Sequence, residues 1–288
     1  MPNGIIIIDK PQDWTSHDVV AKLRGKLRER RMGHAGTLDP MATGVLPVFV
    51  GRATRAVEFA AEGEKEYVAG LKLGFVTDTQ DTTGTVLETR SVTVGTGELE
   101  AVLEQFRGPI LQIPPMYSAL KRDGKKLYEL ARKGVEVERE ARPITIHGLA
   151  LEGQTGEGEY TLRVRCSKGT YIRTLCHDIG EKLGCGGVMS SLRRTMACGF
   201  TIADAIPLGE VLEAEDAEGL LRSVDSYFVS YQRLTIDGKA LERAKNGNPF
   251  PWKAPDGDYR IYGPGGEFLL LGRCNCNVMT TIKSFYEV

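Results

Sequence analysis

Alternating apolar and polar residues mark several strands along this 288-residue chain. Residues 4–8 form an apolar run that predicts a buried strand, and residues 65–75 and 159–166 alternate as half-buried strands do. The same reasoning predicts strands at 84–89, 135–138 and 143–151, the first of them paired with 65–75 across a polar turn. These segments predict a sheet that is assembled from distant parts of the chain.

Helical spacing of apolar residues interrupts the strands. Thr15 and Asp18 form a capping box before an apolar stripe, which predicts a helix that runs to about Arg30 with its basic residues outside. Similar spacing predicts helices at 99–106, before Gly108-Pro109, and at 172–183, after the Lys168-Gly169-Thr170 corner. The fold class is therefore α+β, with a mixed sheet interrupted by helices.

The pattern changes near Tyr231. A short helix at 236–247 and strands at 259–262, 267–272 and 278–285 follow, with a Gly/Pro turn at 263–266. A chain of this length is long for one hydrophobic core, so we expect two domains, at 1–231 and 232–288.

Composition restricts the class of protein. Apolar residues make up 41% of the chain and charged residues 26%, as in soluble globular proteins. The segment GIIIID is too short to span a membrane and lacks the layout of a signal peptide, so we expect a cytoplasmic protein with no membrane contact. The six cysteines form no C-x-x-C pair, which predicts reduced thiols and no metal site.

The net charge of −1 does not favour nucleic-acid binding, but the distribution of charge matters more than the sum. Lysine and arginine residues cluster at 22–31, at 121–133 and at Arg193-Arg194. These clusters could form one basic face for RNA, or each could be an ordinary solvated face of a helix.

Residues 31–55, RMGHAGTLDPMATGVLPVFVGRATR, are the most informative segment, with Asp39 at its centre. Gly36 and Gly44 can adopt backbone conformations that other residues avoid, and Pro40 favours an extended Asp39. Such a loop could hold one carboxylate at the edge of a cleft. An isolated Asp-Pro pair is more often a surface turn.

The whole segment resembles the signature of the TruB family, bacterial tRNA pseudouridine-55 synthases related to the Cbf5/dyskerin enzymes. The resemblance implies that Asp39 is the catalytic nucleophile. It extends over about residues 4–200 through four motifs, including Lys168-Gly169-Thr170-Tyr171-Ile172-Arg173. Because burial disfavours an ionised carboxylate, a cation must lie close to Asp39. The resemblance of the second motif implies that Arg173 is this cation, a catalytic residue that clamps the carboxylate in a bidentate manner.

Three further residues are expected to contact the uridine by the same resemblance. Tyr67 corresponds to the active-site tyrosine, catalytic and substrate-binding, although its strand position also suits a core residue. Tyr171 and Leu192 correspond to the lining of the uridine pocket, and a leucine is more often simply core.

The resemblance also implies a fourth substrate-binding residue, His34, and a set of residues that support the site. His34 would most often make a structural hydrogen bond, but the resemblance implies that it fills the gap left by flipped bases. Lys10, Gly36, Thr37 and Lys168 are expected to support the site.

The resemblance also implies the architecture and the reaction. It predicts a pseudouridine synthase catalytic domain with a mixed, largely antiparallel sheet, a basic RNA-gripping insertion at about 112–140, and a PUA-like β-barrel at the C-terminus. The substrate would be the T stem-loop of tRNA, isomerised at position 55 without a cofactor or metal. We expect a monomer with no obligatory protein partner; an RNA-binding module without catalysis and a partner-dependent subunit remain alternatives.

Overall fold

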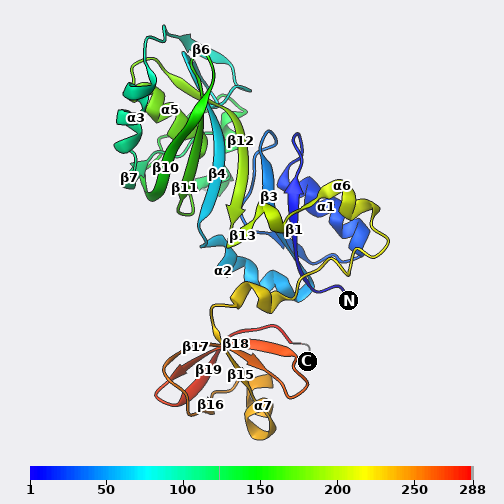
Figure 1. Cartoon of the computed structure of the whole chain (residues 1–288). Coiled ribbons are helices and arrows are strands. Elements are labelled where there is room, and N and C mark those ends of the chain that lie inside the picture. Colours follow the sequence, from blue (N-terminus) through cyan, green and yellow to red (C-terminus); the bar gives the residue numbers. More distant parts are fainter. Residues whose placement is uncertain (123, 287–288) are drawn as a thin grey trace.

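The computed structural model describes residues 1–122 and 124–286. Within them, one large mixed sheet of ten strands runs through the N-terminal part of the chain, and a smaller curled sheet forms the C-terminal part (Figure 1). None of the described helices is long and apolar enough to cross a membrane.

The large sheet is mostly antiparallel. Its strands, in spatial order, are β14 (Ile206–Pro207), β1 (Gly4–Lys10), β3 (Thr43–Val50), β12 (Gly187–Ala197), β4 (Lys65–Leu73), β11 (Glu159–Cys166), β10 (Arg142–Gly156) and β7 (Gly108–Gln112), with β2 (Met32–His34) on β3 and β13 (Phe200–Thr201) on β12. Only β1–β14 and β3–β12 are parallel among the described strand pairs of this sheet. Within the described residues β3 and β12 meet at two positions, Thr43 with Arg193 and Gly44 with Arg194, so this junction joins two half-sheets.

Helices cover the sheet in two groups. The helices α3 (Thr96–Glu104) and α5 (Ile172–Lys182) pack on the half containing β4, β10 and β11, whereas α1 (Ser16–Leu27) and α6 (Leu208–Glu213) pack on β1 and β3 (Figure 1). The capping box of Thr15 and Asp18 starts α1, as expected, and Arg28 ends it in a left-handed conformation. The packing of both groups places the β3–β12 junction between two hydrophobic cores.

The C-terminal sheet is a curled half-barrel, consistent with a PUA-like domain. In spatial order it contains β15 (Gln232–Thr235), β17 (Gly257–Tyr262), β18 (Phe268–Asn275), β19 (Val278–Ser284) and β16 (Phe250–Pro251), with α7 (Gly238–Lys245) beside it. It lies below α2 (Val57–Ala61) in Figure 1. The connecting 3₁₀ helices are η1 (Gly51–Ala56), η2 (Ile202–Asp204) and η3 (Val224–Phe228).

Aromatic packing joins the two parts. The ring of Phe228 in η3 lies 6.3 Å from that of Phe268 and 5.8 Å from that of Phe285, both in the C-terminal part. Arg55 Nη1 adds a hydrogen bond to the carbonyl of Ser284 at 2.8 Å. The half-barrel is therefore docked on the large domain through a buried aromatic cluster.

Several sequence predictions need correction. Residues 135–138 form no strand in the described structure. The strand β6 (Val86–Thr89) pairs with β5 (Phe75–Thr77) beyond Gly74, not with the main alternating strand, because the chain bends at that glycine. The edge strand β7, which begins at Gly108 where the predicted helix ends, was not predicted.

Candidate active site

Asp39 lies in the loop between β2 and β3, which is held through its backbone. The amide of Leu38 donates to Ser16 Oγ at 2.9 Å, and the amide of Ala42 donates to the carbonyl of Asp39 at 3.0 Å. Neither bond uses the Asp39 carboxylate, whose side chain is 40% exposed. The loop therefore presents a carboxylate to an open side of the sheet.

Arg173, in the first turn of α5, is the cation beside Asp39. Its Nε lies 3.0 Å from Asp39 Oδ2, and its side chain is only 7% exposed. Its Nη1 donates to the carbonyl of Thr79 at 3.1 Å and its Nη2 to the carbonyl of Tyr117 at 2.8 Å. The expected bidentate clamp on Asp39 is therefore wrong for this structure, because backbone carbonyls occupy both ends of the fork.

A second carboxylate, Asp81, lies near the same guanidinium and was missed in the sequence, where it belongs to a polar turn. Its Oδ2 is 3.9 Å from Arg173 Nε, and its side chain is 7% exposed. Its Oδ1 accepts from the hydroxyls of Thr79 and Thr83, at 2.7 and 2.6 Å. The turn thus fixes Asp81 against Arg173. In the sequence, only the high content of Asp and Thr in this turn could have indicated the second carboxylate.

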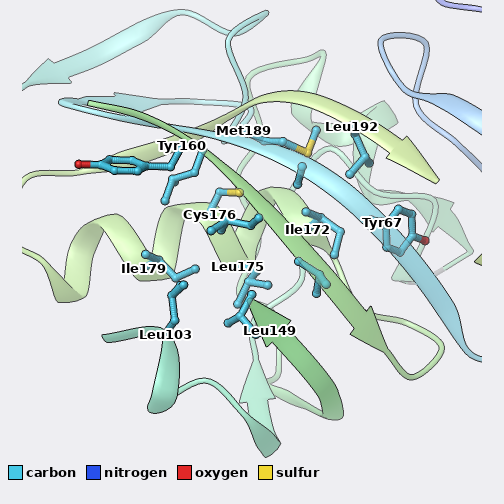
Figure 2. Packing of buried hydrophobic residues seen from close by; sticks show 14 of the residues in the cluster. Tyr67, Leu103, Leu149, Tyr160, Ile172, Leu175, Cys176, Ile179, Met189 and Leu192 are labelled. Atoms are coloured by element: carbon cyan, nitrogen blue, oxygen red, sulfur yellow. The ribbon is translucent and has the colours of Figure 1, made fainter. Parts of the chain in front are cut away.

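Tyr67 and Leu192 lie on β4 and β12, at the end of the core that α5 covers. Figure 2 shows the Tyr67 ring beyond Ile172, with its hydroxyl directed away from the cluster. Burial raises the pKa of Tyr67, while the charge of Arg194, which lies opposite Tyr67 on β12, opposes that rise. Tyr67 therefore lies both in the hydrophobic core and at the candidate site.

Arg194 is the most buried arginine of the site, at 1% exposure, and sequence analysis placed it in a surface cluster. Its Nε donates to the carbonyl of Val45 at 2.7 Å and its Nη2 to that of Gly36 at 3.0 Å. Gly36 and Gly44 both have positive φ, and a Cβ at Gly44 would lie 2.2 Å from the Arg194 carbonyl oxygen. The two glycines of the motif therefore allow the chain to pass close to Arg194.

Tyr171 precedes α5 and is held by a residue that sequence reasoning missed. The side-chain amide of Gln112, at the end of β7, accepts from the Tyr171 backbone amide at 2.8 Å and donates to its carbonyl at 3.0 Å. Burial raises the pKa of the Tyr171 hydroxyl. The strand β7 thus positions the start of the helix that carries Arg173.

His34 ends β2 and is mostly enclosed. Burial lowers the pKa of its imidazole, and the positive charge of Arg194 adds to this effect. Its Nδ1 is buried and, in the part of the chain that the structure describes, has no hydrogen-bond partner. The structural hydrogen bond that a lone histidine would most often make is therefore not seen at this nitrogen.

Lys10 is fully buried at the end of β1, next to the Asp39 loop. Its Nζ donates to the carbonyls of Pro11, Trp14 and Pro40, at 2.8, 2.6 and 3.3 Å. Burial lowers its pKa to about 8, although Asp13 and Asp39 oppose the shift. The bond to Pro40 links β1 to the residue that follows Asp39.

The remaining candidates lie at the surface. Thr37 is exposed in the Asp39 loop, and Lys168 is exposed and forms an ion pair with Glu62. Arg193 does not form a basic patch with Arg194, because it points the other way and pairs with Asp9 at 2.8 Å. The support expected from Lys168 thus involves neither Asp39 nor Arg173 directly.

The basic insertion contacts the site through the residues at its start. It contains the hairpin β8 (Lys121–Arg122) and β9 (Lys125–Lys126), followed by α4 (Leu127–Ala131). Lys126 Nζ and Arg132 Cζ lie 5.4 and 5.3 Å from the centre of the Tyr128 ring. The carbonyl of Tyr117, before the hairpin, is the one that accepts from Arg173.

This fold and this carboxylate–guanidinium pair define a pseudouridine synthase. The family model described as "TruB family pseudouridylate synthase (N terminal domain)" matches residues 24–172, and the "tRNA pseudouridylate synthase B C-terminal domain" matches residues 173–226. The chain belongs to the TruB family.

Relatives match over nearly the whole chain. The tRNA pseudouridine synthase B of Pseudomonas fluorescens Pf-5 is 46% identical over 282 residues, which cover 94% of this chain and 91% of the relative. That of Clostridium kluyveri is 43% identical over 277 residues, which cover 94% and 95%. A solved structure titled "Crystal Structure of a Cbf5-Nop10-Gar1 Complex" is 26% identical with a TM-score of 0.75, covering 99% of this chain and 85% of that one.

Proposed function

We propose that this protein isomerises the uridine at position 55 in the T loop of tRNA to pseudouridine. The observation that carries the proposal is the Asp39–Arg173 pair at 3.0 Å, formed by the two motifs that resemble the family's catalytic motifs. The printed names of the relatives, tRNA pseudouridine synthase B, support tRNA as the substrate.

The reaction breaks the C1′–N1 bond of the uridine and forms a C1′–C5 bond, and the proton on C5 is replaced by one on N1. It transfers no electrons and no phosphate, so the chain's own residues can perform it without a cofactor. Asp39 supplies the carboxylate, which attacks the sugar or the base, or removes a sugar proton. Arg173 holds this carboxylate in place through its Nε, 3.0 Å from Asp39 Oδ2.

Other residues act on the flipped base. We assign the ring of Tyr67 to stacking on the uracil and its hydroxyl to proton transfer, with Tyr171 and Leu192 lining the pocket. Extruding a base from folded RNA costs a few kcal/mol, and stacking by an aromatic side chain returns about 1–3 kcal/mol per base. His34, with a pKa below its usual value, is suited to this stacking as a neutral ring.

Two outer parts of the chain would bind the rest of the tRNA. We infer a catalytic domain at 1–231, with the hairpin and α4 of the insertion at 112–140 gripping phosphates, and an RNA-binding domain at 232–288. Specific recognition would come from splayed loop bases, since the stem offers mainly shape. We expect a monomer that needs no protein partner.

Mapping the product tests this proposal. An unmodified tRNA transcript is incubated with the purified protein, and pseudouridine is located by base-specific chemistry; we expect one site, at position 55. A transcript with cytidine at that position should bind but show no pseudouridine. Modification elsewhere would overturn the position, and binding without modification would favour an RNA-binding module or a subunit that needs partners.

A further inference from the structure

The site contains a buried positive charge with no carboxylate partner. Charged side chains buried in the described residues are Lys10, Lys65, Asp81, Arg173 and Arg194. Arg173 lies close to Asp39 and Asp81, whereas Lys10, Lys65 and Arg194 form no ion pair with any described residue, and of these three only Arg194 is an arginine. An arginine keeps its charge when buried, so this charge is permanent and calls for a role beyond filling space.

The contacts of Arg194 converge from three elements. Its own strand β12 meets β3 at Gly44, its Nε donates to Val45 on β3, and its Nη2 donates to Gly36 in the Asp39 loop. On the neighbouring strand β4, Tyr67 lies directly opposite Arg194, and the charge of the guanidinium opposes the rise in the Tyr67 pKa. A single rigid group is thus bonded to the loop of Asp39 and belongs to the residue that pairs with Tyr67 across the strands.

The sequence makes room for this group. Gly36 has φ +80, and a Cβ there would lie 3.1 Å from Arg194 Nη1. A side chain at this position would be strained by the backbone and would press on the guanidinium. The glycine therefore keeps its carbonyl within reach of Nη2.

We propose that Arg194 is a positioning residue that fixes Asp39 and Tyr67 relative to each other across the junction of the two half-sheets. The proposal rests on the proposed function, in which both residues act on the same uridine. Planar donors in a fixed fork suit this role, because they define direction as well as distance. Lysine offers a compact charge on a flexible stem and cannot donate to Val45 and Gly36 in the same fixed directions.

A purely structural role would make a different prediction. It would lower the fraction of folded protein and leave the rate per folded molecule unchanged. A positioning role lowers the rate of the chemical step at saturating tRNA, whereas tRNA affinity and the fold remain, since a misplacement of about 1 Å can cost about 100-fold in rate.

The test compares Arg194→Lys and Arg194→Gln with Arg163→Lys and Arg163→Gln. Arg163 lies on β11, half exposed, and pairs with Glu66 and Glu152 at the surface. Single-turnover pseudouridine formation, tRNA binding and circular dichroism are measured for each variant. We expect both Arg194 variants to lose about 100-fold in rate with unchanged binding, and both Arg163 variants to stay within about threefold of the wild type.

A rate for folded Arg194→Lys within about threefold of the wild type would overturn the proposal. So would a loss fully explained by unfolded protein. If the Arg194 variants do not fold, the NMR signal of the Arg194 side-chain ¹⁵Nε–H group is measured in proteins that keep Arg194. In the wild type this proton should exchange slowly with solvent. The signal should shift in Tyr67→Phe but not in Tyr227→Phe, and no shift in Tyr67→Phe would refute the coupling. If the shift is present but the wild type forms no pseudouridine, only the proposed function is refuted, and the coupling of Arg194 to Tyr67 stands.

Discussion

At the scale of single residues, the three nitrogens of the Arg173 guanidinium contact three different partners, and this explains how Asp39 is held. Arg173 gives Nε to Asp39 and both terminal nitrogens to the carbonyls of Thr79 and Tyr117. The ion pair is thereby oriented by backbone that cannot rotate away. Because Asp39 is 40% exposed and Arg173 7%, the cation is fixed by the protein while the carboxylate remains accessible from outside.

We expect Arg173→Lys to lose about 100-fold or more in single-turnover rate, because one ammonium cannot replace three directed donors. The two partly buried carbonyls left without a donor should also lower the free energy of unfolding by about 1–3 kcal/mol. Rate measurements at saturating tRNA and urea unfolding test both effects. Arg165→Lys, at the surface pair with Glu64, is the control; equal rates for the two variants would contradict the assignment.

Lys10 gives a prediction about pH. Its pKa is about 8 in the folded protein, mainly through burial, against 10.5 when unfolded. Between these values the unfolded chain binds more protons, so the stability of the wild type should rise with pH. Relative to Lys10→Met, the free energy of unfolding of the wild type should increase by about 1–3 kcal/mol between these two pKa values.

Urea titrations at several pH values measure this difference, and exposed Lys22→Met serves as the control. A difference between wild type and Lys10→Met that does not change with pH would show that Lys10 has an ordinary pKa.

The sequence identified Asp39, Arg173 and Tyr67, which the structure brings together with Tyr171 and Leu192. It did not identify Arg194, Asp81 or Gln112, because their partners are distant in the chain and their residue types are common at surfaces. Arg194 in particular belongs to an Arg-Arg pair whose two members point to opposite faces of β12. Which of them is buried depends on strand register alone.

At the scale of elements, clear alternation and helical spacing predicted β1, α1, β4, β11 and α5. The central strand β12 was missed because it carries Arg193, Arg194 and two serines, which break the apolar pattern of a strand. The strand β3 was recognised only as an apolar run. The hairpin of β8 and β9 was missed because its residues are nearly all charged, so burial provides no pattern.

That hairpin predicts a specific salt dependence. Lys121 and Lys125 are exposed, and replacing both by Gln should weaken tRNA binding and reduce the slope of log affinity against log salt by about 1–2. The rate at saturating tRNA should not change, because neither side chain contacts Asp39 or Arg173 among the described residues.

The double variant Lys72→Gln, Lys182→Gln removes the same charge elsewhere on the large domain. An equal loss of slope in both double variants would mean that the insertion has no special part in gripping the RNA.

At the scale of the whole molecule, the half-barrel is docked rather than tethered. Phe228 has ring contacts with Phe59 on one side and with Phe268 and Phe285 on the other. Lys283 and Glu58 add an ion pair at 2.5 Å. Rigid docking sets a fixed distance between the candidate active site and the C-terminal surface.

We expect Phe228→Ala to lower the free energy of unfolding by about 3–5 kcal/mol, since it removes a buried ring from this cluster. The C-terminal part should then become sensitive to limited proteolysis, and tRNA affinity should fall more than the saturated rate. Val229→Ala, one residue away and 67% exposed, is the control. A saturated rate that falls as far as affinity would show that docking also shapes the active site.

The most direct test of the account is single-turnover pseudouridine formation on an unmodified T stem-loop by wild type and Asp39→Asn, each with a chelator and no added metal. We predict that the wild type converts the RNA, whereas Asp39→Asn binds it with similar affinity and forms no detectable pseudouridine. Conversion by Asp39→Asn at a rate near that of the wild type would contradict the central role of this carboxylate.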